Sequence, residues 1–134
     1  MLHDFKTINS YNLFKSRVPI CNYDEIETNI ERCRKGEQNI FWPSTIKWFA
    51  KSSGTTNSKS KFIPISQESL DYCHYAANKD LLCLYLSNNE NSKLFEGKNL
   101  RLGGSKSTYS ENGSIYGDLS AILIENMPIW ADFS

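Results

Sequence analysis

The chain lacks an excess of charge of either sign. Its 134 residues include 15 Lys and Arg against 15 Asp and Glu, so the formal net charge at pH 7 is zero. Proteins that bind DNA or RNA normally carry a basic excess gathered on one face. The basic residues form no such stripe here, and Trp42 and Trp48 have no basic residues interleaved with them, so we interpret both as packing residues rather than base-stacking platforms. The composition argues against a nucleic-acid-binding protein.

Long apolar runs are also missing. No stretch approaches the roughly 18 apolar residues of a membrane helix, and no N-terminal apolar run resembles a signal peptide. We therefore expect a soluble, cytoplasmic protein without a membrane partner. At 40% hydrophobic and 13% aromatic residues, the chain still has enough apolar material for the core of one domain, so wholesale disorder is not expected.

Spacings typical of metal ligands are absent as well. The four cysteines are Cys21, Cys33, Cys73 and Cys83. Their gaps fit neither C-x-x-C nor a zinc finger, and neither histidine has a partner three or four residues away. We interpret the cysteines as buried free thiols in a reducing cytosol and assign no metal ligand.

The most informative segment that the chain does contain is residues 51–61, a short loop rich in hydroxyl groups with one glycine and three lysines. It lies between residues 46–50 and 61–65, two apolar segments that we predict to be strands. Such a loop can turn backbone N–H groups inward as a nest, with hydroxyl donors and lysine charge added, which suits a polyphosphate. A solvated hairpin connection explains the same composition, so composition alone leaves both interpretations open.

The order of residues in the loop decides between known phosphate-binding patterns. It is not the P-loop, which needs G-x-x-x-x-G-K-[ST], because Gly54 has no second glycine before a lysine. It resembles instead the phosphate loop of acyl-adenylate-forming enzymes, roughly [ST]-[ST]-G-[ST]-[ST]-x-G-x-x-K. The matching residues are Ser52, Ser53, Gly54, Thr55, Thr56 and Lys61. Ser58 stands where that pattern usually has its second glycine, so the flexibility of the loop is expected to differ.

Short sequence motifs on both sides of the loop narrow the resemblance to one family within these enzymes. They are Val18-Pro19-Ile20, Tyr23-Asp24-Glu25-Ile26, Phe49-Ala50-Lys51 joined to the loop, Gly103-Gly104-Ser105, and Tyr116-Gly117-Asp118-Leu119-Ser120-Ala121. Together they resemble the auxin-responsive promoter protein family of acyl acid amido synthetases, which belongs to the firefly-luciferase-like superfamily, and they look most like its bacterial members. The resemblance covers nearly all of the chain.

This resemblance implies an α/β fold, with β-strands flanked by helices, that is part of the large N-terminal domain of an adenylate-forming enzyme. Family members are several times longer, so residues 1–134 are expected to be a partial N-terminal adenylation domain. The C-terminal lid domain, the adenine-binding motif and the acidic ribose contact have no counterpart. The Tyr116-Gly117-Asp118 word is not the ribose-contacting motif of the family, because its neighbours match an earlier segment.

The family resemblance also implies the chemistry of the intact enzyme. ATP and a small carboxylic acid would give an acyl-adenylate, and the amine of an amino acid would then attack the acyl carbon to form an amide. The loop residues would bind the β- and γ-phosphates, and Lys61 would neutralise charge on the departing pyrophosphate. Mg²⁺ is expected with the nucleotide, although no acidic cluster is present to hold it. We assign no residue a catalytic role.

Three interpretations stay open for this chain. The first is a fragment of such an enzyme, expected to be inactive alone. The second is an inert remnant that binds phosphate without turnover, and the third is an unrelated interaction module with a serine-rich loop. Because the flanks of the domain are missing, we expect exposed apolar surface and a tendency to self-associate.

Helical periodicity predicts two helices before the loop. The first covers about residues 9–16, with Asn9 or Ser10 as its cap and Phe14 turned inward. The second is expected to begin at Asp24 as its N-cap, to run to about residue 35, and to end at Gly36.

A longer helix is predicted after the loop, from a cap at Ser66 to about Ser87. Its apolar stripe is expected to consist of Leu70, Cys73, Ala77, Leu81, Leu84 and Tyr85. Tyr72, His74 and Tyr75 lie on other faces of this prediction, where packing is favoured over a role in lining the acyl pocket of the family.

Two further elements are predicted near the end of the chain. Residues 98–102 read as a buried strand that ends at the pair Gly103-Gly104. Such a pair permits a close approach to a ligand or a neighbouring strand, or makes a tight turn, which we favour. Asp118 is expected to cap a last helix that Pro128 ends.

Overall fold

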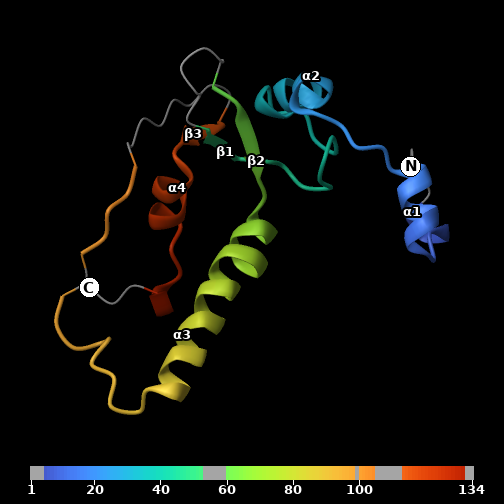
Figure 1. Ribbon diagram of the computed structural model, residues 1–134. Coiled ribbons are helices and arrows are strands. Elements are labelled where there is room, and N and C mark those ends of the chain that lie inside the picture. The colour runs from blue at the N-terminus through green and yellow to red at the C-terminus, as the bar shows by residue number, and fades with distance from the viewer. Residues whose placement is uncertain (1–4, 53–59, 99, 105–112, 132–134) are drawn as a thin grey trace.

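The computed structural model describes residues 5–52, 60–98, 100–104 and 113–131 (Figure 1). Its helices are α1 (Tyr11–Arg17), α2 (Tyr23–Arg34), α3 (Ala76–Asn88) and α4 (Leu119–Glu125), with a π-helical segment η2 (Ser69–Tyr75) and the 3₁₀ turns η1 (Phe5–Thr7) and η3 (Ile129–Ala131). Its strands are β1 (Trp48–Lys51), β2 (Phe62–Ile65) and β3 (Ile115–Gly117).

The three strands form one sheet in the order β2-β1-β3. The predicted strands on either side of the loop are confirmed as β1 and β2, which pair antiparallel with Lys51 opposite Phe62. β3 joins the other edge of β1 in parallel, with Ala50 opposite Gly117. The chain reaches β3 after passing through α3, so helices and strands alternate and the predicted α/β class is confirmed.

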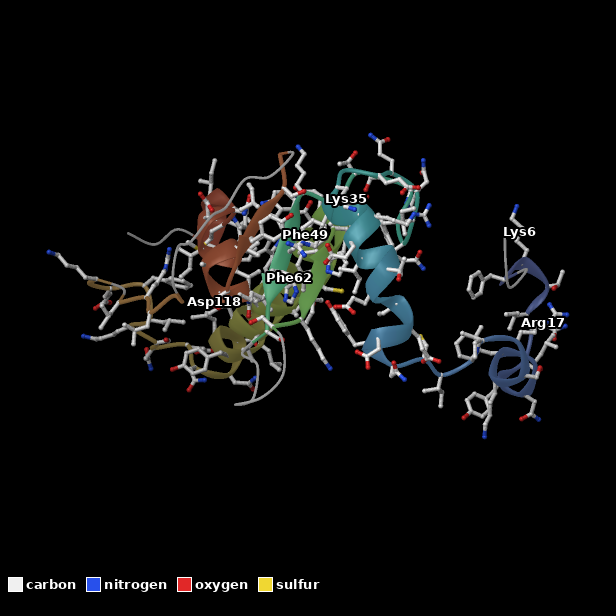
Figure 2. The ribbon with its side chains drawn as sticks, turned by 90° about the horizontal axis from the view of Figure 1, so that it is seen from above. Lys6, Arg17, Lys35, Phe49, Phe62 and Asp118 are labelled. Atoms are coloured by element: carbon white, nitrogen blue, oxygen red, sulfur yellow. The ribbon has the colours of Figure 1, made fainter. Side chains whose placement is uncertain are left out.

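Alternation along the strands gives the sheet two apolar faces. Phe49 and Tyr116 point to one face, where they pack with Cys33 of α2 and Ile46. The other face is covered by η2 and α4, through a cluster of Ala50, Ile65, Leu70, Tyr75 and Ile122. Figure 2 shows the strands between α2 on one side and α4 on the other. Because both faces are covered, the strands are rich in apolar residues rather than alternating with polar ones.

α2 begins two residues earlier than predicted. Its N-cap is Asn22, whose side chain accepts from the Glu25 N–H at 3.2 Å, while the Glu25 carboxylate accepts from the Asn22 N–H at 2.6 Å. This capping box satisfies two free N–H groups at once, so the prediction of Asp24 as cap is wrong, and Asp24 lies in the first turn. The predicted end is confirmed, since Gly36 has φ 87° and closes a Schellman motif.

The helix after the loop starts as predicted and then departs from α-helical phase. The Ser66 hydroxyl accepts from the Ser69 N–H at 3.1 Å, which confirms the cap. The η2 segment then makes π-type bonds, such as Ala76 N–H to Asp71 C=O. Leu70 and Tyr75, five residues apart, are both buried. The wider turn shifts every later residue around the axis, so the predicted stripe is wrong beyond Leu70. Cys73, Leu81, Leu84 and Tyr85 are exposed instead.

Two other expectations are corrected. α1 has Ser10 as its cap, as predicted, but Phe14 is exposed and α1 lies apart from the sheet (Figure 1). Residues 98 and 100–102 form no strand, and Leu100 and Leu102 are almost fully exposed. The strand that completes the sheet is β3, further along the chain.

Candidate functional site

The predicted phosphate loop is the connection of the β1–β2 hairpin. Beyond the Lys51–Phe62 pair, the Ser52 N–H donates to the Lys61 carbonyl at 2.9 Å. The Lys61 N–H donates in return to the Ser52 hydroxyl at 3.2 Å. The structure therefore brings together Ser52 and Lys61, the first and last residues of the predicted site. The remaining four, Ser53, Gly54, Thr55 and Thr56, lie outside the described residues.

We call the hydrogen-bonded pair Ser52 and Lys61, where the hairpin opens into the loop, the hairpin mouth. Tyr23, the first residue of α2, holds its β2 side in place. Its hydroxyl accepts from the Phe62 N–H at 2.9 Å and lies 3.4 Å from the Phe62 carbonyl oxygen, to which it donates. The exposed Lys61 side chain passes over the same ring, with Nζ 5.1 Å from the Tyr23 centroid. The ammonium group thus has an aromatic support at the edge of the loop.

A second cation lies beside the strands at this end. The Arg34 guanidinium carbon is 4.0 Å from the Phe62 ring centroid and 4.8 Å from that of Tyr116. Arg34 also pairs with Glu31, and its carbonyl accepts from the Ser114 hydroxyl at 3.1 Å. The sequence did not reveal that Arg34 packs on these two rings. Basic residues are common in the last turn of a helix, and the aromatic partners of Arg34 are distant in the chain.

Gly103 and Gly104 do not form the predicted turn at the end of a strand. They lie close against α4 and its N-cap residue. The Gly104 N–H donates to the Ser120 hydroxyl at 2.9 Å. A Cβ atom on Gly104 would clash with Oδ2 of Asp118. Asp118 is at the N-cap position of α4 as predicted, although its side chain makes no capping hydrogen bond. Since β1 and β3 are parallel, Ser52 and Asp118 follow strands that end at the same edge. In open α/β sheets this is where ligands bind.

Two apolar cavities lie away from the hairpin mouth. One, with a volume of about 300 Å³, lies between α3 and α4 and includes Tyr75 in its wall. The Tyr75 hydroxyl donates to the Leu123 carbonyl at 2.8 Å, and burial raises the pKa of this phenol. The other cavity, of about 510 Å³, includes Tyr72. Of the three residues considered for an acyl pocket, Tyr72 and Tyr75 thus face different cavities.

Within the described ranges, no three His, Cys, Asp or Glu side chains lie close enough together to hold a metal ion. Among these residues, too, no helix has the length and apolar character needed to cross a bilayer.

Comparison with known proteins identifies relatives over much of this chain. The model of the GH3 family N-terminal domain matches residues 2–134. The "Probable indole-3-acetic acid-amido synthetase GH3.2" of Oryza sativa subsp. japonica is 37% identical over 59 residues, which are 43% of this chain and 10% of the relative. The "Indole-3-acetic acid-amido synthetase GH3.5" of Arabidopsis thaliana is 33% identical over 70 residues, 52% of this chain and 11% of the relative.

Solved structures give the same result for the fold. One, described as "AtGH3.15 acyl acid amido synthetase in complex with 2,4-DB", superposes with a TM-score of 0.66 at 24% identity, covering 87% of this chain and 20% of the other. A second, "GH3.15 acyl acid amido synthetase", gives 0.67 at 24% identity over 88% and 21%. The chain therefore spans about a fifth of these structures. With the family match running from residue 2 to residue 134, the chain belongs to the GH3 family, the family of acyl acid amido synthetases, and corresponds to part of its N-terminal domain.

Proposed function

We propose that these residues are the phosphate-binding part of an ATP-dependent acyl acid amido synthetase. The whole enzyme would adenylate a small carboxylic acid and join it to an amino acid, and residues 1–134 would be part of its adenylation domain. The observation that carries the proposal is the hairpin mouth, where reciprocal hydrogen bonds join Ser52 to Lys61. Family membership supports the same reaction class.

The chemistry of the described residues fits a polyphosphate. Ser52 offers a hydroxyl, Lys61 an exposed ammonium group, and both stand at the carboxyl end of β1. In the proposal the hydroxyls of Ser53, Thr55 and Thr56 add donors, and Gly54 lets the backbone approach the phosphates. Their task is to position the phosphates and to stabilise negative charge as pyrophosphate departs. ATP supplies the adenylyl group that activates the carboxylate, and Mg²⁺ is expected to accompany it.

The test is ATP–pyrophosphate exchange in the presence of a carboxylic acid such as benzoate, measured on the protein that contains these residues. Lys61→Ala should lower the exchange rate by roughly tenfold or more, because a charge-assisted contact to phosphate is lost. Lys47→Ala is the matched control, since Lys47 is an exposed lysine just before β1, at the other end of the strand. Equal rates in wild type and Lys61→Ala would remove Lys61 from the site.

The 134-residue chain itself separates the alternatives. Equilibrium dialysis with tripolyphosphate should show binding that Lys61→Ala weakens, even if the chain catalyses no exchange. Binding without exchange in any form of the protein would favour an inert phosphate-binding fragment. If neither phosphate binding nor nucleotide dependence is found, the synthetase proposal fails for this chain.

A further inference from the structure

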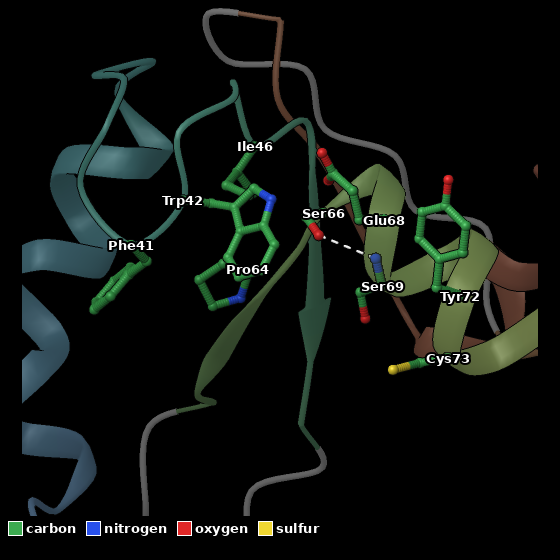
Figure 3. A pocket seen from close by; sticks show the side chains of 9 residues that line it. All are labelled: Phe41, Trp42, Ile46, Pro64, Ser66, Glu68, Ser69, Tyr72 and Cys73. Carbon is green, nitrogen blue, oxygen red and sulfur yellow. Dashed lines mark hydrogen bonds between the residues drawn. The ribbon is translucent and has the colours of Figure 1, made fainter. Parts of the chain in front are cut away.

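The larger of the two apolar cavities lies at the end of the hairpin opposite the loop. The loop leaves the sheet at Lys51 and Phe62, whereas the cavity contacts Ile46 just before β1 and Pro64 in β2. Its volume is about 510 Å³, which suits a small organic molecule. Figure 3 shows its wall, made by residues 41–46, the end of β2 and the first turns of the following helix. It is therefore distinct from the proposed phosphate site.

One polar atom in this wall has no partner. Oε2 of Glu68 is buried and makes no hydrogen bond among the described residues. The nearby Ser66 hydroxyl, in contrast, is bonded to the Ser69 N–H at 3.1 Å. Figure 3 shows the Glu68 carboxylate on the side of the cavity where Ile46 and Ser66 lie. A buried carboxylate oxygen without a donor is costly, and Glu68 belongs to the cavity wall, so a positive charge inside the cavity would be stabilised by this carboxylate.

The rest of the wall favours a positively charged donor. Phe41, Trp42 and Tyr72 present aromatic rings that are at least 40% exposed, and such rings attract cations through their π-faces. None of the nine lining residues is Lys or Arg, so no side chain of the wall can neutralise Glu68. A carboxylate together with several aromatic rings is the chemistry that recognises an ammonium ion.

The π-helical segment η2 contributes three residues to the cavity wall. Ser69, Tyr72 and Cys73 of η2 line the cavity, while Leu70 and Tyr75 of the same segment are buried in the core on its other side. The wider turn keeps both core residues inward although they are five residues apart. π-turns are rare and occur often at functional sites, and this one lies in the cavity wall.

We propose that this cavity binds an organic ammonium ion with an apolar or aromatic body, its nitrogen on the Glu68 carboxylate and its body between Trp42 and Tyr72. Three compounds of similar size separate charge from shape: benzylammonium, benzyl alcohol and benzoate. Isothermal titration calorimetry of the 134-residue chain at pH 7 should show benzylammonium binding at least tenfold more tightly than the other two.

Variants identify the residues. Glu68→Gln keeps the shape of the side chain and should weaken benzylammonium roughly tenfold while leaving benzyl alcohol unchanged. Glu90→Gln, an exposed glutamate after α3, is the matched control and should bind like wild type. Trp42→Leu should weaken benzylammonium severalfold, because the π-face is removed and the apolar surface is kept.

Three results would overturn the proposal. They are no binding of any of the three compounds, binding of benzoate or benzyl alcohol as tight as that of benzylammonium, and unchanged affinity in Glu68→Gln. If near-ultraviolet circular dichroism shows that Glu68→Gln does not fold, Trp42→Leu decides, and full retention of the cation preference in that variant would reject the site. Because tripolyphosphate binding and the Lys61→Ala variant are measured separately, failure here leaves the proposed function standing, and the reverse also holds.

Discussion

The hydroxyl of Tyr75 donates a 2.8 Å hydrogen bond to the backbone carbonyl of Leu123 and so joins the helix after the loop to α4. Tyr75 is 6% exposed, and its partner lies near the end of a helix whose last carbonyls lack intrahelical donors. The sheet face beneath Tyr75 and Ile122 is therefore closed by a polar contact as well as by apolar packing.

Tyr75→Phe is expected to lower the free energy of unfolding by about 1 kcal/mol, because the ring still packs and only the hydrogen bond is lost. Urea denaturation followed by circular dichroism measures the change. Tyr11→Phe, in the exposed helix α1, should leave stability unchanged. A loss in Tyr75→Phe no larger than in this control would show that the bond contributes nothing.

The glycines form a graded series for a second prediction. Gly104→Ala should cost about 2 to 3 kcal/mol, because its Cβ would meet Cβ and Cγ of Asp118 at 2.5 and 2.6 Å. Gly103→Ala should cost less, because only the flexible end of Ile124 lies in the way. Gly117→Ala meets nothing within 4 Å and is the control. Thermal unfolding of the three variants should follow this order, and a Gly104 variant as stable as the Gly117 variant would contradict the packing described here.

The cap of α2 offers a third test. Asn22→Ala removes a side chain that bonds the Glu25 N–H and should lower stability by about 1 kcal/mol. Asp24→Ala should cost only a few tenths of a kcal/mol, because Asp24 interacts with the helix dipole alone. If chemical denaturation shows the larger loss for Asp24→Ala, the helix begins where the sequence pattern predicted rather than at Asn22.

Thiol reactivity should divide the four cysteines. The expectation that the cysteines are buried is correct only for Cys33, whose burial raises the pKa of its thiol, because Cys21, Cys73 and Cys83 are exposed. Because the thiolate is the reactive form, three thiols should react quickly with a disulfide reagent at pH 8 and one slowly. Mass spectrometry of the partly modified chain should find Cys33 unmodified. Early modification of Cys33 would mean that α2 detaches from the sheet readily.

A pH dependence follows from the pair at the end of α2. The Arg32 guanidinium donates to the Glu37 carboxylate and lowers the pKa of that carboxyl below its ordinary value of 4.5. Since the folded pKa is depressed, the stabilisation is present above pH 4.5 and is lost as the pH falls through the folded pKa. Glu37→Gln should have a slightly lower Tm than wild type at pH 7 and the same Tm near pH 2. Both groups are exposed, so the difference is expected to be small, and a gap that persists at pH 2 would assign it to another cause.

Local sequence signals were sufficient where local contacts decide the structure. The strands beside the loop, the caps at Ser10 and Ser66, and the end of α2 at Gly36 follow from residues a few positions apart. The α/β class followed from the alternation of such elements together with the family resemblance.

Contacts between distant parts of the chain account for the features that sequence reasoning missed. The π-turn exists because Leu70 and Tyr75 are both buried against the sheet and α4, which no periodicity within one helix reveals. The position of Arg34 between Phe62 and Tyr116 needs three separate elements. The unpaired oxygen of Glu68 depends on a cavity whose walls come from both sides of the loop.

The outer edge of β2 limits how this sheet can grow. Since Ser52 and Lys61 form a hydrogen-bonded pair, the alternation of antiparallel pairs turns the backbone groups of Phe62 and the nitrogen of Pro64 away from β1. The Phe62 N–H is already bonded to the Tyr23 hydroxyl, and Pro64 has no N–H to offer. A strand added there would find neither donor, which protects this edge from pairing with another chain. The Tyr23 hydroxyl and the Pro64 ring thus block pairing at the β2 edge. A further strand could join this sheet only at its other edge, beside β3.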